Sequence, residues 1–129
     1  MFQKSECWRF NAILCFLSFF FYAINTGLRR QGVWTECLFM KNHFNDCLAM
    51  VAELSLYNFF SELRGRKGIY NPALLFLVFL CSSIFWEYGV VYLRKNSISD
   101  PLDVLCYFFG AVAYYLFYRI YLHKTSAMK

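Results

Sequence analysis

The sequence predicts an all-α fold, an integral membrane bundle of four transmembrane helices in a single domain over residues 1–129. The first observation is composition: 60% of the 129 residues are hydrophobic, 22% are aromatic and only 16% are charged. A soluble domain of this length cannot bury so much apolar surface, because small folds leave a large share of their area in water. The second observation is that the apolar residues are grouped in long runs. The length of these runs is close to the roughly 20 residues that a helix needs to cross a bilayer.

Four apolar runs define the expected spans, and each has a recognisable start or stop. The first run stops at Arg29-Arg30, and the third contains Asn71-Pro72, a typical helix start, close to its beginning. The fourth begins at Asp100-Pro101, which is a start of the same kind. Short connections between the later runs favour antiparallel neighbours. The expected spans are residues 10–28, 38–60, 69–93 and 101–122.

The second run is the least apolar of the four. It carries charged or polar side chains that include Lys41, His43, Asp46 and Glu53. A helix among three apolar neighbours can carry such groups if they face inward. The alternative is that this run is re-entrant or lies at the membrane interface, so that only three helices cross.

Basic residues are distributed unevenly between the two sides that four spans create. Eight fall on the side of both termini and the loop around residue 65, against five on the opposite side. The positive-inside rule then places the N- and C-termini in the cytoplasm, in a multi-pass protein of the cell membrane. The eight are Lys4, Arg9, Arg64, Arg66, Lys67, Arg119, Lys124 and Lys129, and the five are Arg29, Arg30, Lys41, Arg94 and Lys95.

Several function classes lack their signatures in this chain. The basic residues lie at the ends of the apolar runs rather than on one soluble face, so no nucleic-acid partner is predicted. The six cysteines show neither CxxC nor a His/Cys ligand spacing, although a Cys37–Cys47 disulfide is an open alternative. Motifs such as HExxH, GxSxG or a P-loop do not occur, so no resident cofactor is predicted and catalysis stays an open question.

The candidate functional site is a set of acids at the ends of the apolar runs. Asp46 lies near the start of the second run, Glu87 near the end of the third, and Asp103 at the start of the fourth. Four spans place these three ends at one membrane face, whatever the absolute orientation. Acids near hydrocarbon are costly and therefore indicate function. The candidate ligand-binding residues around them are His43, Asn45, Arg94, Asp100 and Tyr107.

Each of these residues also has a purely structural interpretation. Asp100 is well placed to be an N-cap, and Asp103 can accept hydrogen bonds from free amides in the first helical turn. Glu87 can form an ion pair with Arg94, and His43 can be an interfacial histidine that binds nothing. The sequence leaves both interpretations open.

Glu87, Arg94 and Asp103 form a spaced pattern, with Gly110-Ala111 seven residues after Asp103. This pattern resembles the signature of the VanZ-like family of small bacterial membrane proteins. In that family a Glu near the end of one span is followed by an Arg in the loop and an Asp that opens the next span. This chain departs from the family pattern in having Val90 in place of Gln and Tyr107 in place of Asn. The family's apolar Pro-Gly motif in an earlier span also has no counterpart in residues 41–46. The resemblance implies a setting in the bacterial cell envelope more than an activity.

Three functions fit these observations. The first hypothesis is an acidic pocket at one membrane face, formed by Asp46, Glu87 and Asp103, that binds a lipid-linked or cell-envelope ligand. The second is a membrane-embedded hydrolase or transferase acting on lipid phosphates, in which His43 and the same acids hold a divalent cation. The third is a structural or regulatory small membrane protein whose acids only cap helices and form ion pairs. The lipid bilayer is the partner that all three share, and the oligomeric state is left open.

Overall fold

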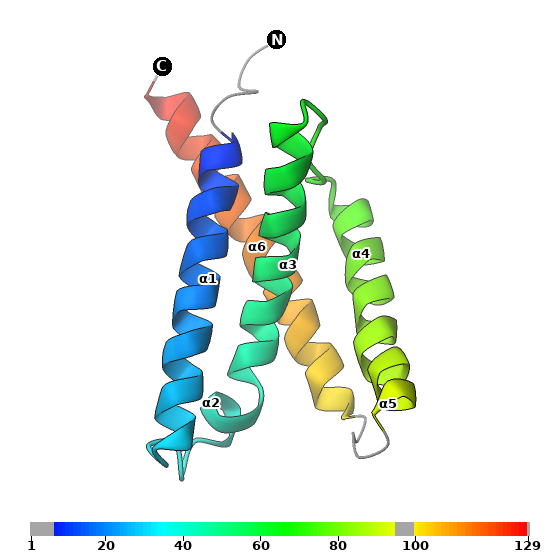
Figure 1. Cartoon of the computed structure of the whole chain (residues 1–129). Helices are drawn as coiled ribbons and strands as arrows, with labels where there is room; N and C mark the ends of the chain where they lie inside the picture. Colours follow the sequence, from blue (N-terminus) through cyan, green and yellow to red (C-terminus); the bar gives the residue numbers. More distant parts are fainter. Residues whose placement is uncertain (1–6, 95–99, 129) are drawn as a thin grey trace.

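The computed structural model describes residues 7–94 and 100–128, and every regular element in these ranges is a helix. The elements are α1 (Cys7–Arg30), α2 (Leu38–Asn42), α3 (Phe44–Leu63), α4 (Pro72–Ile84), η1 (Phe85–Gly89), α5 (Val90–Leu93) and α6 (Pro101–Ala127). The start of α1, the end of α3 and the end of α6 lie at one end of the bundle, and α2 and α5 lie at the other (Figure 1). The two loop-rich ends are therefore well separated.

Three helical segments in the described residues are long and apolar enough to cross a membrane. They are Cys7–Arg30, Pro72–Leu93 and Pro101–Ala127, which match the first, third and fourth expected spans. The prediction of an all-helical chain with membrane-type spans is confirmed to this extent. Helix α3, which corresponds to the expected second span, is not among the three.

Helix α1 buries polar side chains and exposes apolar ones. Asn11, Ser18 and Asn25 are at most 3% exposed, whereas Ile13 and Phe16 are 61% and 69% exposed. In water such an arrangement would be unfavourable, because each Å² of exposed apolar surface costs roughly 25 cal/mol. In hydrocarbon the outward apolar groups carry no such cost and the inward polar groups can find partners. The helix is therefore suited to a lipid environment.

The expected second span is interrupted near its beginning. Helix α2 ends at Asn42 and α3 begins at Phe44, with the backbone of His43 outside the α-helical region between them. The amide of His43 still donates a hydrogen bond to the carbonyl of Phe39, at 2.9 Å. The sequence predicted a single helix over residues 38–60, but this part of the chain forms two helices, and His43 lies at their junction.

The later helices begin where the sequence predicts. The side chain of Asn71 accepts a hydrogen bond from the amide of Ala73 at 2.9 Å and caps α4. The side chain of Asp100 accepts from the amide of Leu102 at 3.0 Å, so the prediction that Asp100 is an N-cap is confirmed. Between α4 and α5 the chain forms one wider turn, the π-helix η1, a feature that recurs at functional sites.

Helix α3 packs closely against α1 on one side and α6 on the other, while α4 packs against α6. The approach of α6 is closest at Gly110, where an added Cβ would lie 2.5 Å from the backbone oxygen of Cys47. Met50, Leu54 and Tyr114 are almost completely buried in the core between these helices. This close packing brings the first turns of α3 and α6 together.

Two further expectations concern charges and cysteines. Lys4, Lys95 and Lys129, which contribute to the count of basic residues, lie outside the described residues. All six cysteines are free, so the alternative of a Cys37–Cys47 disulfide is not realised. The thiol of Cys47 lies close to that of Cys106.

Candidate functional site

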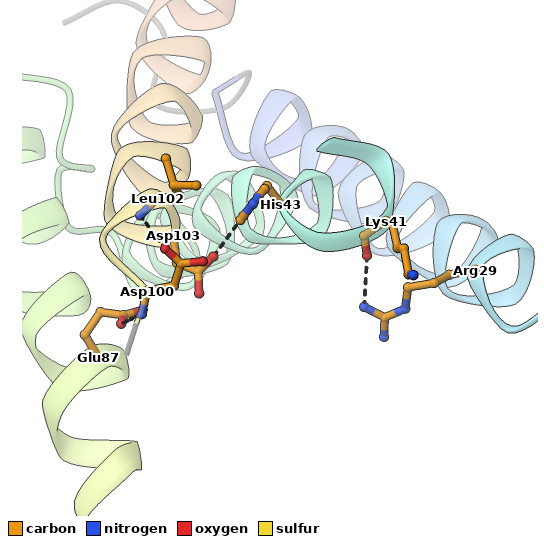
Figure 2. Close-up of polar contacts among 7 residues, drawn as sticks. All are labelled: Arg29, Lys41, His43, Glu87, Asp100, Leu102 and Asp103. Carbon is orange, nitrogen blue, oxygen red and sulfur yellow. Dashed lines mark hydrogen bonds and ion pairs between the residues drawn. The ribbon is translucent and has the colours of Figure 1, made fainter. Parts of the chain in front are cut away.

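The candidate site lies where the first turns of α3 and α6 meet. His43 and Asp103 point toward each other from these two turns, as Figure 2 shows, with Nδ1 of His43 3.0 Å from Oδ1 of Asp103. Their side chains are 15% and 25% exposed. A hydrogen bond that is partly shielded from water is electrostatically stronger than one on an open surface. The contact joins two segments 60 residues apart in the sequence.

Asp100 and Glu87 form the second part of the site. The backbone amide of Asp100 donates a hydrogen bond to Oε2 of Glu87 at 3.1 Å, and Figure 2 shows the two residues side by side. Glu87 is only 5% exposed and takes part in further contacts. Its carboxylate therefore joins η1 to the beginning of α6. Arg94, which the sequence left open as an ion-pair partner of Glu87, is exposed and follows directly after the end of α5.

Asp46 lies against the same group from the first turn of α3. Its carboxyl group lies close to Asp103, and the charges of His43 and Glu87 also act on it. Carboxylates this close repel one another unless a proton or a cation lies between them. Asp46, Glu87 and Asp103, which were predicted to converge, thus lie in one neighbourhood together with His43.

Three residues of this neighbourhood meet the spacing of metal ligands. One ligand atom each from His43, Asp100 and Asp103 lies within 4.8 Å of the other two, and all three residues are half-buried. An imidazole nitrogen and carboxylate oxygens are ligands for divalent metal ions such as Zn²⁺ and Mn²⁺. In the described part of the chain, this is the group of three His, Cys, Asp or Glu residues with such a spacing.

The remaining candidate residues are placed less centrally. Asn45 is buried but turns toward α1, where it accepts from Asn25 at 2.9 Å and donates to Thr26 at 3.1 Å. Tyr107 is buried one turn after Asp103 and lies near the acids, whose charges act on it. Asn45 therefore positions α3 against α1, whereas Tyr107 forms the inner wall of the acidic neighbourhood.

A second polar cluster, toward the opposite end of the bundle, was not predicted. The side-chain amide of Asn11 donates to the hydroxyl of Tyr70 at 2.7 Å and to Oε2 of Glu62 at 3.3 Å. The hydroxyl of Tyr114 donates to Oδ1 of Asn11 at 2.7 Å and accepts from Asn58 at 2.5 Å. The signal for this cluster was present as Asn11 and Asn58, two lone amides within apolar runs that are both 0% exposed.

The polar groups of this second cluster form hydrogen bonds with one another. It links α1, α3, α6 and the segment before α4, where Ile69 and Tyr70 lie, and each of its amide groups has protein partners. Polar groups that are satisfied in this way within a bundle stabilise one arrangement of helices. The acidic site, in contrast, gathers several carboxyl groups around His43.

No protein-family model matches the chain, and no curated protein or solved structure matches it either. The resemblance of Glu87, Arg94 and Asp103 to the VanZ-like signature therefore stays a prediction. The function has to be inferred from the contacts and charges of the site.

Proposed function

We propose that this chain is a multi-pass protein of the cell membrane that binds a divalent cation at the acidic site and, through it, the phosphate of a lipid-linked ligand. The observation that carries the proposal is the approach of His43, Asp100 and Asp103, whose ligand atoms lie within 4.8 Å of one another. Atoms on opposite sides of one ion, with bonds of roughly 2.0–2.4 Å, are about 4–5 Å apart. The three groups are therefore spaced as ligands of a single ion.

The charges around the trio favour a cation over a neutral or anionic ligand. Asp46 lies against Asp103, and Glu87 lies against the first turn of α6, so four carboxyl groups surround one imidazole. A divalent ion offsets this negative charge, and three protein ligands leave coordination positions open. A phosphate oxygen is a suitable ligand for such an open position.

The proposal includes four spans, with α3 as the second. Its 20 residues are about 30 Å long as an α-helix, which matches the hydrocarbon core of a bilayer. Its polar side chains at Asn45, Ser55 and Asn58 are buried against α1, α6 and the chain before α4, so they need not face lipid. A helix enclosed in this way can cross the membrane with lower hydropathy than its neighbours.

The level of the site in the membrane favours a lipid-linked ligand. His43 precedes α3 directly and Asp103 lies in the first turn of α6, two helices proposed to cross the bilayer, so the cation would lie near the lipid headgroups. With both termini in the cytoplasm, this end faces the outside of the cell. The resemblance of Glu87, Arg94 and Asp103 to the VanZ-like signature also implies a setting in the bacterial cell envelope. A cation at this level would bind the phosphate group of a lipid of the bacterial envelope.

Metal binding by the purified protein tests the proposal. Zn²⁺ and Mn²⁺ are titrated by calorimetry into the protein in detergent, and Mn²⁺ binding is also followed by electron paramagnetic resonance. The double variant His43→Asn/Asp103→Asn is expected to bind at least about tenfold more weakly, because it removes two of three ligands. Inorganic phosphate is expected to bind only to the metal-loaded protein.

Glu36→Gln is the matched control, since Glu36 is an exposed acid in the loop before α2 and touches none of the trio. It is expected to bind the metals as the native chain does. Equal metal binding by the native chain and the double variant contradicts the proposal. If, in addition, the exchange His43→Asp/Asp103→His restores stability lost in each single variant, the contact is a structural lock between α3 and α6.

A metal-dependent hydrolase or transferase on lipid phosphates is a second candidate, because of Asp46. We infer this role from its position: Asp46 contacts Asp103 but is not one of the three spaced ligands. A carboxylate beside a metal site can accept the proton of an attacking water. Release of phosphate from a lipid phosphate that stops with a chelator and with Asp46→Asn supports catalysis, and binding without release supports a receptor.

A further inference from the structure

A groove on the side of the bundle lies apart from the acidic site. It is formed by α1, α3, α4 and η1, has a volume of about 670 Å³, and is lined mostly by apolar side chains. Ala49 and Ala52 on α3 form part of its wall, and their small side chains leave space that larger residues would fill. Volumes between about 300 and 1,000 Å³ are typical of small-molecule sites.

In the proposed four-span bundle, the groove lies at the depth of the hydrocarbon. Two of its walls, α1 and the segment Pro72–Leu93, are long and apolar enough to cross a membrane. A molecule entering the groove would therefore come from the lipid phase, and its body would have to be apolar.

A polar pair lies within the mostly apolar lining, which also includes Ser18 and Tyr22. Oε1 of Glu53 accepts a hydrogen bond from Ser82 at 2.5 Å, and both residues line the groove. Glu53 lies nine residues after Phe44, about 13 Å along α3, where a carboxyl group is costly. Ser18, also in the lining, already donates to the carbonyl of Leu14 at 2.8 Å.

The carboxyl of Glu53 retains an acceptor. Within residues 7–94 and 100–128, the bond from Ser82 is the hydrogen bond that Glu53 makes. Its other oxygen can accept from a ligand, and a satisfied acceptor is worth far more in hydrocarbon than in water. An apolar groove with one well-placed acceptor fits an apolar molecule with one donor.

We propose that this groove binds a membrane-soluble alcohol, a hydrocarbon body whose hydroxyl group donates a hydrogen bond to Glu53. The site is separate from the acidic site and needs no cation. It also explains why a carboxyl group occurs at mid-depth in α3, where leucine would cost nothing. The hydrocarbon body would lie along Phe19, Leu48 and Trp86, which line the groove.

Photo-crosslinking of the full chain in phosphatidylcholine vesicles tests this proposal. The probe is a long-chain fatty alcohol with a diazirine in its chain, and crosslinked peptides are mapped by mass spectrometry. Crosslinks are expected at groove residues of α1, α3 and η1. The unlabelled alcohol is expected to compete at least about tenfold better than the alkane of equal length, because one buried hydrogen bond is worth roughly a factor of ten.

Two pairs of variants sharpen the test. Ala49→Phe fills the groove and is expected to abolish crosslinking, whereas Ala23→Phe on the exposed face of α1 is expected to leave it unchanged. Glu53→Leu is expected to remove the preference for the alcohol over the alkane, and Glu53→Gln, which keeps an acceptor, to retain part of it.

Crosslinks spread evenly over the outer faces of the helices, or equal competition by alcohol and alkane, overturn the proposal. The competition experiment uses only the native chain, so it decides the question even if a variant fails to fold. Metal binding at His43, Asp100 and Asp103 does not enter this readout, and the acidic site can fail its own test without affecting the groove.

Discussion

Tyr114 is the most completely buried large side chain of the bundle, with 0% of its surface exposed. Its hydroxyl accepts from Asn58 and donates to Asn11, so one oxygen connects α6 to α3 and α1. Tyr114→Phe leaves a donor and an acceptor without their partner in the core. We expect the variant to lose about 1–3 kcal/mol of unfolding free energy, the usual cost of an unsatisfied buried polar group. Chemical denaturation in mixed micelles measures this loss.

Tyr115→Phe is the control for this prediction. Tyr115 is the next residue along α6, is only partly buried and makes no hydrogen bond in the described ranges. Removal of its hydroxyl is expected to change the unfolding free energy by less than about 0.5 kcal/mol. Equal losses in the two variants would show that the bonds of Tyr114 contribute nothing specific.

The contacts of single polar residues were the hardest feature to predict. The side chains of Asn11 and Asn58 also bond to residues of other helices, and these bonds depend on helix packing that periodicity does not specify. The acids behave differently, because connectivity alone brings Asp46, Glu87 and Asp103 to one end of a four-span bundle. The short distance between the side chains of Asp100 and His43 could not be predicted from the order of the helices. It depends on which face α6 turns toward α3.

At the scale of elements, Gly110 sets the distance between α3 and α6. A Cβ at this position would lie 2.5 Å from the carbonyl oxygen of Cys47 and 2.9 Å from Cβ of Met50. Neither atom can move without the backbone of α3, so the helices would have to separate. We expect Gly110→Ala to lower the unfolding free energy by about 1–3 kcal/mol, despite the higher helix propensity of alanine.

The matched control is Gly27→Ala in α1. An added Cβ at Gly27 meets no atom within 4 Å, so the gain in helix propensity is not offset. This variant is expected to be neutral or more stable by up to about 1 kcal/mol. The comparison is made by thermal unfolding of both variants in the same detergent. A Gly110→Ala variant as stable as the native chain would mean that α3 and α6 do not approach closely at this point.

Local signals predicted the beginnings of the helices well and their interruptions poorly. Asn71-Pro72 and Asp100-Pro101 act within one turn through a side-chain cap and a fixed proline φ, so both starts could be predicted. The break at His43 and the wide turn η1 have no proline or glycine pair that would announce them. Both occur beside the acidic site, where tertiary contacts outweigh local preference.

At the scale of the whole molecule, the number of membrane crossings decides where the acidic site can exist. If α3 crosses, the starts of α3 and α6 lie at one face, which the 3.0 Å contact of His43 with Asp103 requires. If only α1, Pro72–Leu93 and Pro101–Ala127 cross, α3 stays at the face where α1 ends, while α6 starts at the opposite face. The contact of His43 with Asp103 is then impossible, because a bilayer core about 30 Å thick separates them.

Cysteine labelling distinguishes the two topologies. Single cysteines replace Gln31, Lys67, Arg94 or Met128 in a chain without its six native cysteines, and a membrane-impermeant maleimide is applied to sealed vesicles. Four spans place Gln31 and Arg94 on one side and Lys67 and Met128 on the other, whereas three spans place Gln31, Lys67 and Met128 together. We expect the four-span result, with Lys67 on the cytoplasmic side because it lies in the most basic loop. Labelling of Gln31 and Lys67 from the same side would exclude the acidic site, because Asp103 could then no longer reach His43.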